Sequence, residues 1–187
     1  MNIRIIRKSE NVITRWSGGT TSQVYIYPEN ASYADRNFIF RLSMANAEIS
    51  DSVYTVLPGV KRYLVSLSGE SIVVHEKECV HLEPYGTVDC FMGDTHTEAH
   101  GAIRDFNLMI KGADGDMSVL REKELYIDPS FDFYALYADD MASLCVYNKT
   151  YDLNPGDCIL LTELSSEKIT FSKGTGRVIL CRIKLGQ

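Results

Sequence analysis

Two pairs of polar residues occupy alternate positions in runs that are otherwise mostly apolar. Arg41 and Ser43 form one pair, and Asp105 and Asn107 form the other. A guanidinium group binds a carboxylate through two parallel hydrogen bonds, and a carboxylate beside an amide can accept hydrogen bonds from N–H groups. These residue types suit a small ligand that carries a carboxylate and a second polar group. The alternative is that Arg41 and Asp105 form an ordinary ion pair between neighbouring strands.

The segment Trp16–Ser22 reads Trp-Ser-Gly-Gly-Thr-Thr-Ser and offers a different kind of contact. Backbone N–H groups beside Gly18 and Gly19 can approach an anion closely, because these residues have no side chain in the way. Thr20 adds a hydroxyl group, and Trp16, the single tryptophan, could cover an apolar part of a ligand. The simpler interpretation is a Gly-Gly turn with Trp16 in the core.

Arg62 is a third candidate cation. It lies at the start of a predicted strand, shortly after the turn residues Pro58 and Gly59. It either faces the same cavity as Arg41 or belongs to a solvated strand end. From the local sequence alone, the solvated strand end is the simpler interpretation.

Catalytic chemistry has weaker support in the sequence. Asp105 could act as a general acid or base, but a guanidinium beside it would lower its pKa and make it a poorer base at neutral pH. The sequence contains no Ser-His-Asp, Cys-His or nucleophile-elbow pattern. The leading interpretation therefore includes no catalytic residue.

The four histidines are too scattered to predict a metal site. Two imidazoles on one face of a strand must stand at alternate positions, and His75 is followed by Glu76 and Lys77. His81 lies beyond a turn, and His96 and His100 fall in a predicted loop. We expect neither a metal ion nor a cofactor.

Bulk composition excludes several classes of protein. The chain has 187 residues, a net charge of −6 and no run of Lys or Arg, which argues against a nucleic-acid partner. No apolar stretch approaches the roughly 20 residues that span a bilayer, and the N-terminus has no signal-peptide pattern. Five cysteines without a Cys-x-x-Cys motif are typical of reduced thiols. We therefore expect a cytoplasmic protein with no membrane partner.

Most of the chain alternates with the period of two that is typical of strands. Gly and Pro separate these runs, and helical periodicity is nearly absent. The pattern predicts an all-β protein built from antiparallel sheets. In one strand, Val24 and Ile26 should share one face, and Gln23, Tyr25 and Tyr27 the other. The predicted strands are residues 2–7, 23–27, 38–45, 61–68, 71–75, 104–111, 131–137, 144–147, 158–161, 168–172 and 177–185.

Two stretches of the sequence repeat one another. Residues 71–77 read Ser-Ile-Val-Val-His-Glu-Lys, residues 143–149 read Ser-Leu-Cys-Val-Tyr-Asn-Lys, and a short strand and a Pro/Gly turn follow each copy. A strand–turn–strand unit used twice predicts a duplicated β-barrel. We expect an N-terminal half, residues 1–112, that carries the pocket. The C-terminal half, residues 113–187, should be a structural lobe, with a homodimer through it as a further expectation.

These motifs together resemble the HutD/Ves family. The matching blocks, in order, are Trp16-Ser17-Gly18-Gly19-Thr20-Thr21, Arg41-Leu42-Ser43, Tyr54 with Pro58, Gly59 and Arg62, and Arg104-Asp105-Phe106-Asn107-Leu108-Met109. The resemblance spans roughly residues 3 to 185, although Ser17 stands where the family commonly has Asn. It implies a cupin-like fold, a bicupin of two fused antiparallel β-barrel or jelly-roll halves in one chain.

The resemblance also implies a shared pocket and a biological role. Family members are associated with histidine utilisation and are thought to sense a pathway intermediate such as N-formylglutamate or urocanate. By the same resemblance, one ligand site would be formed by Trp16, Gly18, Gly19, Thr20, Arg41, Ser43, Arg62, Asp105 and Asn107.

Three classes of function are consistent with these observations. The leading one is a metal-free, cupin-like protein that binds a small carboxylate metabolite in a regulatory or accessory role. The second is an enzyme that acts on such a metabolite with Asp105 as its acid or base. The third is a protein-interaction module that acts through a strand edge or a dimer face.

Overall fold

The computed structural model describes residues 1–186, and these form nineteen β-strands and one short 3₁₀ helix, with no α-helix among them. The prediction of an all-β protein is confirmed. The chain divides into two compact units. Unit 1 combines Met1–Glu10 with the residues from Asp114 onward, and unit 2 is Asn11–Ala113.

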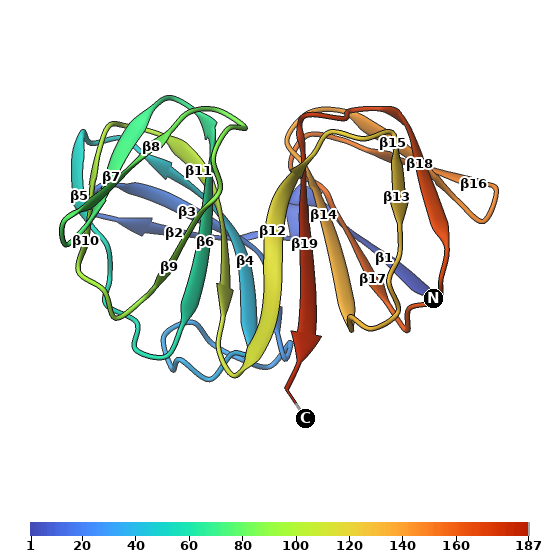
Figure 1. Cartoon of the computed structure of the whole chain (residues 1–187), viewed down its shortest axis with the longest axis horizontal. Coiled ribbons are helices and arrows are strands. Elements are labelled where there is room, and N and C mark those ends of the chain that lie inside the picture. Colours follow the sequence, from blue (N-terminus) through green and yellow to red (C-terminus); the bar gives the residue numbers. More distant parts are fainter. Residues whose placement is uncertain (187) are drawn as a thin grey trace. The chain divides into compact units, whose positions relative to one another are not determined.

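Unit 2 contains two antiparallel sheets (Figure 1). The six-stranded sheet has the order β2 (Val12–Trp16), β3 (Gly19–Tyr27), β4 (Phe40–Ala47), β11 (Arg104–Ile110), β6 (Lys61–Ser68) and β9 (Asp89–Met92). The four-stranded sheet has the order β5 (Asp51–Val53), β10 (Thr97–His100), β7 (Ser71–His75) and β8 (Glu78–Leu82).

Unit 1 is also built from two antiparallel sheets, and it contains the 3₁₀ helix η1 (Lys8–Glu10). The five-stranded sheet has the order β1 (Asn2–Ile6), β17 (Cys158–Thr162), β14 (Phe133–Ala138), β19 (Val178–Leu185) and β12 (Ala113–Leu120). The four-stranded sheet has the order β13 (Glu124–Tyr126), β18 (Lys168–Lys173), β15 (Ala142–Val146) and β16 (Lys149–Leu153).

The sequence repeat corresponds to a repeated hairpin. The first copy is the hairpin β7–β8 and the second is β15–β16, and each lies at the same end of its four-stranded sheet. The second hairpin turns through Tyr147 and Asn148, which both have positive φ, as a tight two-residue hairpin turn requires. The larger sheets also share a strand order, with β4-β11-β6-β9 matching β12-β19-β14-β17.

The first ten residues belong to unit 1, which differs from the expected N-terminal half over residues 1–112. Strand β1 pairs with β17 over its whole length, from Asn2 opposite Thr162 to Ile6 opposite Cys158. This pairing joins segments that are far apart in the sequence, so no local pattern indicates it.

The interiors of the two units differ. In unit 1, one large cluster of apolar side chains fills the space between the sheets, with Tyr134, Leu136, Leu144 and Ile159 among its fully buried members. Unit 2 instead has smaller apolar clusters, one around Leu64 and Phe91 and another around Phe38, Leu57 and Met109.

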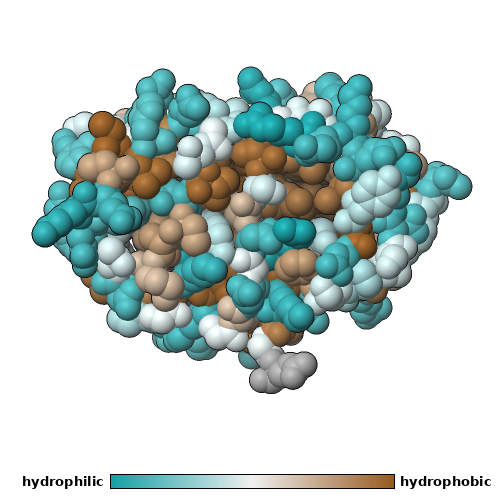
Figure 2. Space-filling model, in the orientation of Figure 1, coloured by the Kyte–Doolittle hydropathy of each residue, from teal (hydrophilic) through white to brown (hydrophobic). Residues whose placement is uncertain are grey.

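The molecular surface is mixed in character. Hydrophilic side chains border most of the face drawn in Figure 2, and apolar side chains show in the areas between them. In the described part of the chain, no helix is long and apolar enough to cross a membrane.

Asp157 fastens the N-terminal segment of unit 1 to the turn before β17. Its carboxylate accepts hydrogen bonds from the backbone N–H groups of Lys8 and Asn154, both at 3.0 Å, and from the guanidinium of Arg7 at 2.7 Å. Burial opposes ionisation of Asp157, but these hydrogen bonds outweigh it and lower its pKa. The carboxylate therefore stabilises the fold above its unfolded pKa of about 4, and this contribution is lost as the pH falls through its lower folded pKa.

Replacing Asp157 by Ala should lower the free energy of unfolding by about 2–4 kcal/mol, because two backbone N–H groups and the Arg7 guanidinium lose a charged acceptor in partly buried hydrogen bonds. Urea unfolding at neutral pH measures this loss, and the loss should shrink toward pH 3. The matched control is Glu124→Ala, which removes an exposed ion pair of 2.9 Å with Lys168 and should cost less than about 1 kcal/mol. Equal losses in the two variants would contradict the assignment.

Candidate functional site

A cavity of about 250 Å³ lies within unit 2 and is lined by residues of both sheets. Alternate residues of three neighbouring strands form one wall: Arg41, Ser43, Ala45 and Ala47 from β4, Asp105, Asn107 and Met109 from β11, and Arg62 and Leu64 from β6. Ser52 and Val53 of β5 and Ala99 of β10 come from the other sheet. The polar strand face expected from the sequence therefore lines a cavity, and Arg62 belongs to it rather than to a solvated strand end.

Small side chains leave room for this cavity. Ala45 and Ala47 follow the polar residues along β4, and Ala99 and Gly101 contribute to the opposite wall. Sites for drug-sized ligands usually measure about 300–1,000 Å³. At about 250 Å³, the cavity suits a small metabolite better than a large cofactor.

Arg41 is charged and yet only 5% exposed. Its Nε donates a hydrogen bond of 2.9 Å to Oε1 of Gln23, and its Nη1 lies 3.4 Å from Oγ of Ser43. Its guanidinium carbon lies 4.3 Å from the centre of the Tyr33 ring. Burial lowers the pKa of Arg41 to about 10, and the nearby charge of Arg62 adds a smaller effect. The group is still charged at neutral pH.

Arg62 stands on the opposite side of Met109 from Arg41, since both arginines are cross-strand partners of that residue. Its guanidinium carbon lies 4.8 Å from the ring centre of Tyr54 and 5.1 Å from that of Phe91. Within residues 1–186, its Nε has no hydrogen-bond partner. Burial lowers the pKa of Arg62 as well. Aromatic rings contact the guanidinium directly, and the charges of Asp105 and Asp89 act on it with a smaller effect than burial.

The sequence allowed an ion pair between Arg41 and Asp105 as an alternative. In the described structure these two side chains do not form one. The strand register places Ala45 opposite Asp105 and Met109 opposite Arg41, so the two charges are offset along the strands. Among the described residues, neither Arg41 nor Arg62 has a carboxylate oxygen within ion-pair distance. In the described chain the cavity therefore contains two buried cations that form no ion pair with a carboxylate, although the charge of Asp105 acts on Arg62 from a longer distance.

Asp105 and Asn107 are the polar groups of the central strand. Both are buried, and in the described chain neither the Asp105 carboxyl group nor Oδ1 of Asn107 has a hydrogen-bond partner. Burial raises the pKa of Asp105 to about 7, although the charge of Arg62 acts in the opposite direction. The guanidinium of Arg62 acts to lower this pKa, as expected, but the loss of hydration has the larger effect, so the net shift is upward.

The cavity opens between two edge strands. β2 and β5 each lie at the end of a sheet, and both contribute lining residues. Thr14 and Trp16 of β2 and Val53 of β5 are exposed while also lining the cavity. Trp16 therefore lies at the mouth of the cavity, and the alternative of a Trp16 in the core is wrong.

Gly18, Gly19 and Thr20 are outside the cavity lining, in contrast to the expected ligand site. Gly18 has a packing role, because any side chain there would collide with the ring of Trp16 and with Ile49. Gly19 stands against the backbone carbonyl oxygen of Asn46, which leaves no room for a Cβ atom. Thr20 and Thr21 are adjacent in β3, so their side chains point to opposite faces of the sheet, and Thr21 is the one that lines the cavity.

A β-bulge explains why Gln23 was not expected beside Arg41. The register between β3 and β4 shifts between Gln23 and Tyr25, so that Gln23 pairs with Ser43 and Ile26 pairs with Arg41. Paired residues share a face of a sheet, so Gln23 and Ile26 point inward. The predicted face shared by Gln23, Tyr25 and Tyr27 is therefore wrong.

Two tyrosines complete the site and were not predicted as site residues. Tyr33 lies in the β3–β4 connection, and Tyr54 directly follows β5; both line the cavity. Tyr54 is one of the residues on which the family resemblance is based, so the sequence did contain a signal for its place in the site. Tyr33 lies in a connection without periodicity, so only its contact with Arg41 identifies it.

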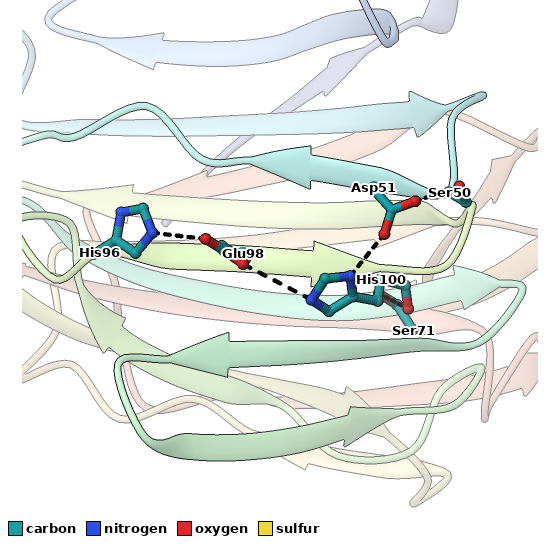
Figure 3. A network of polar contacts seen from close by, with 6 residues as sticks. All are labelled: Ser50, Asp51, Ser71, His96, Glu98 and His100. Atoms are coloured by element: carbon teal, nitrogen blue, oxygen red, sulfur yellow. Dashed lines mark hydrogen bonds and ion pairs between the residues drawn. The ribbon is translucent and has the colours of Figure 1, made fainter.

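The histidines gather on the exposed side of the four-stranded sheet, apart from His75. Glu98 of β10 lies between His96, which precedes the strand, and His100, which ends it, and Asp51 of β5 contacts His100 at 2.7 Å (Figure 3). The predicted loop is correct for His96, which lies in the connection before β10, and wrong for His100, which is the last residue of the strand Thr97–His100. In residues 1–186, no group of three or more His, Cys, Asp or Glu side chains is arranged to hold a metal ion.

A family model described as HutD matches residues 8–180 of the chain. A conserved protein of unknown function from Pseudomonas aeruginosa PAO1 is similar in structure over 100% of both chains, with 20% identity and a TM-score of 0.80. HutD from Pseudomonas fluorescens SBW25, solved in a formate condition, is similar over 98% of both chains, with 20% identity and a TM-score of 0.77. No curated protein matches the sequence.

More distant structures share the architecture. The pirin YhhW from Escherichia coli, solved in complex with nickel(II), is similar over 100% of both chains, with 7% identity and a TM-score of 0.64. The likeness confirms the predicted cupin-like, all-β fold.

Replacing Asp105 by Asn should stabilise the protein without ligand. The folded state holds the Asp105 proton up to about pH 7, whereas the unfolded chain releases it near pH 4. The stability of the wild type should therefore fall as the pH rises between these values. Above pH 7, the variant should gain up to about 4 kcal/mol in the free energy of unfolding.

Urea unfolding between pH 4 and pH 8 measures this difference, which should shrink toward pH 4. Asp94→Asn is the matched control, because Asp94 is an exposed carboxyl group of the same unit. A gain that is the same at every pH would show that the Asp105 carboxylate is not its source.

Proposed function

Because the chain belongs to the HutD family, we propose that unit 2 binds a small carboxylate-bearing metabolite in its cavity. The role that goes with this is regulatory or accessory: the protein senses an intermediate of histidine utilisation, with N-formylglutamate and urocanate as the candidate ligands. Neither a metal ion nor a catalytic step is part of the proposal.

The observation that carries the proposal is the pair of buried guanidinium groups. Arg41 and Arg62 are 5% and 7% exposed, and both line one cavity. A buried cation is unfavourable unless an anion or a set of hydrogen bonds replaces its lost water. In the described chain these cations lack a carboxylate partner. A ligand carboxylate would supply one, through the charge-assisted hydrogen bonds that arginine forms best.

The remaining polar groups suit the second end of such a ligand. Asp105 and Asn107 lie on the same face of β11, two residues apart. The side-chain amide oxygen Oδ1 of Asn107 accepts no hydrogen bond from the described residues. The formamide of N-formylglutamate and the imidazole of urocanate both offer an N–H group to such acceptors. Trp16 at the mouth could cover the apolar part of either ligand.

An enzyme remains the second candidate because of one observation. Asp105 has a pKa of about 7, and a carboxyl group with a pKa near the working pH is suited to transfer protons. Arginines that hold a substrate carboxylate beside it would complete a site for proton abstraction. This candidate uses the same cavity and the same ligands.

Binding is tested by the thermal stability of the protein with N-formylglutamate, urocanate, glutamate or formate. At least one of the first two should raise the melting temperature in a saturable way. Arg41→Gln should weaken this binding about 10- to 100-fold, because it removes a charged donor pair. Arg15→Gln, which changes an exposed arginine of β2, should leave it unchanged. The absence of any saturable shift in the wild type would contradict the proposal.

Proton NMR of each ligand with the protein in D₂O separates sensing from catalysis. For a sensor, every ligand should keep its spectrum, with no deuterium exchange, during overnight incubation. Conversion or exchange that is present in the wild type and lost in Asp105→Asn would favour the enzyme. Asp94→Asn again serves as the control for a change in charge.

A further inference from the structure

The carboxyl group of Asp105 is an unusual neighbour for an anion-binding site. It is 6% exposed, it faces the cavity, and no donor of the described chain forms a hydrogen bond to it. The residues across from it are small: Ala45 on β4 and Ser66 on β6. Ser66 directs its hydroxyl group away, to the carbonyl oxygen of Gly69 at 2.7 Å.

The charged and titratable groups around Asp105 come from several elements. Arg62 of β6 is the cation whose charge favours ionised Asp105, and the Tyr54 hydroxyl group faces it from the segment after β5. Arg41 of β4 lines the same cavity, and β10 presents the uncharged Ala99. Asp89 of β9 is paired with His75 at 2.8 Å, and its charge also acts on Arg62 and Tyr54.

Binding of an anion changes this balance. A carboxylate that pairs with Arg62 cancels the charge that supports ionised Asp105, and it displaces water from the cavity. Two carboxylates that share one low-dielectric site cannot both stay ionised without cost, so one of them takes up a proton. The ligand carboxylate is held by guanidinium groups, whereas Asp105 lacks a donor within residues 1–186. Asp105 is therefore the group that protonates.

We propose that the cavity binds its anionic ligand together with one proton, which Asp105 takes up as the ligand carboxylate reaches Arg62. The inference rests on the proposed function and adds its regulation. Protonated Asp105 can donate a hydrogen bond to the ligand. In the bound state, this hydrogen bond replaces the repulsion between two carboxylates. The pKa of Asp105, about 7, places this exchange in the physiological range.

The sign of the pH dependence follows from linkage. Because binding takes up a proton, the affinity for the anion is highest where Asp105 is already protonated, below about pH 6 to 7. Above that range the affinity should fall by up to tenfold for each pH unit. A sensor built in this way responds to its ligand and to acidity together.

The experiment is titration calorimetry with N-formylglutamate, whose carboxylates do not titrate near neutral pH. Measurements in two buffers of different ionisation enthalpy count the protons taken up with each ligand. Proton uptake by the wild type should rise from about half a proton at pH 7 to close to one proton at pH 8.5, and the pH dependence of its dissociation constant should steepen toward tenfold per pH unit over the same range. Asp105→Asn should take up none and bind with an affinity that does not change with pH, and Asp94→Asn should behave as the wild type does.

The outcomes separate the two proposals. Saturable binding without proton uptake by the wild type overturns this inference and leaves the proposed function standing. Equal uptake in Asp105→Asn also overturns it, because another group would then take the proton. No binding of N-formylglutamate, urocanate or formate at any pH overturns the proposed function, and this inference with it. The wild-type proton count decides the question even if the variant does not fold.

Discussion

Burying a guanidinium group inside a β-sheet sandwich is unfavourable unless something replaces the water that it loses, and unit 2 faces this problem twice. Around Arg41 the replacement is an amide oxygen from Gln23, a hydroxyl group from Ser43 and the ring of Tyr33. Around Arg62 it is two aromatic rings. Both sets are incomplete, since they hold the cations in place but do not neutralise them. In the proposed function, an anionic ligand would complete them.

The acid in the same cavity adds a second constraint. Asp105 is close enough to Arg62 to interact with it, yet burial has the larger effect on its pKa. A carboxylate that fully neutralised Arg62 would remove the attraction for a ligand. A carboxyl group that protonates near neutral pH leaves the cations available when an anion arrives. Under the proposed function, the buried Asp105 carboxyl group lowers the stability of the folded protein and lets the site respond to an anion.

The two units show how one strand order can serve a site or a core. β6 of unit 2 and β14 of unit 1 hold corresponding places in their sheets. β6 turns Arg62 inward, toward a cavity, whereas β14 turns Tyr134 and Leu136 inward, into a continuous apolar cluster. Small residues such as Ala45 and Ala99 leave unit 2 hollow. In the described part of unit 1, larger side chains such as Tyr134 and Leu136 are buried in the apolar cluster between the sheets.

The sequence by itself determined the features that depend on neighbouring residues. The two-residue period of strands is local, so it correctly placed Arg41 with Ser43 and Asp105 with Asn107 on shared faces, and it identified the repeated hairpin. It could not decide between an ion pair and a cavity, because that depends on how β4, β11 and β6 are aligned. That alignment sets Met109, not Asp105, opposite Arg41.

Only the tertiary structure decided the features that depend on distant segments. The bulge in β3 turned Gln23 inward, and the close approach of Trp16 and Asn46 gave Gly18 and Gly19 packing roles outside the cavity. The pairing of β1 with β17 moved the first residues into unit 1. The raised pKa of Asp105 likewise results from burial of its carboxyl group, and the neighbouring residues in the sequence do not indicate how deeply that group is buried. Each of these features depends on which segments pack against one another in the folded chain. Alternation along a strand indicates only which residues share a face of it.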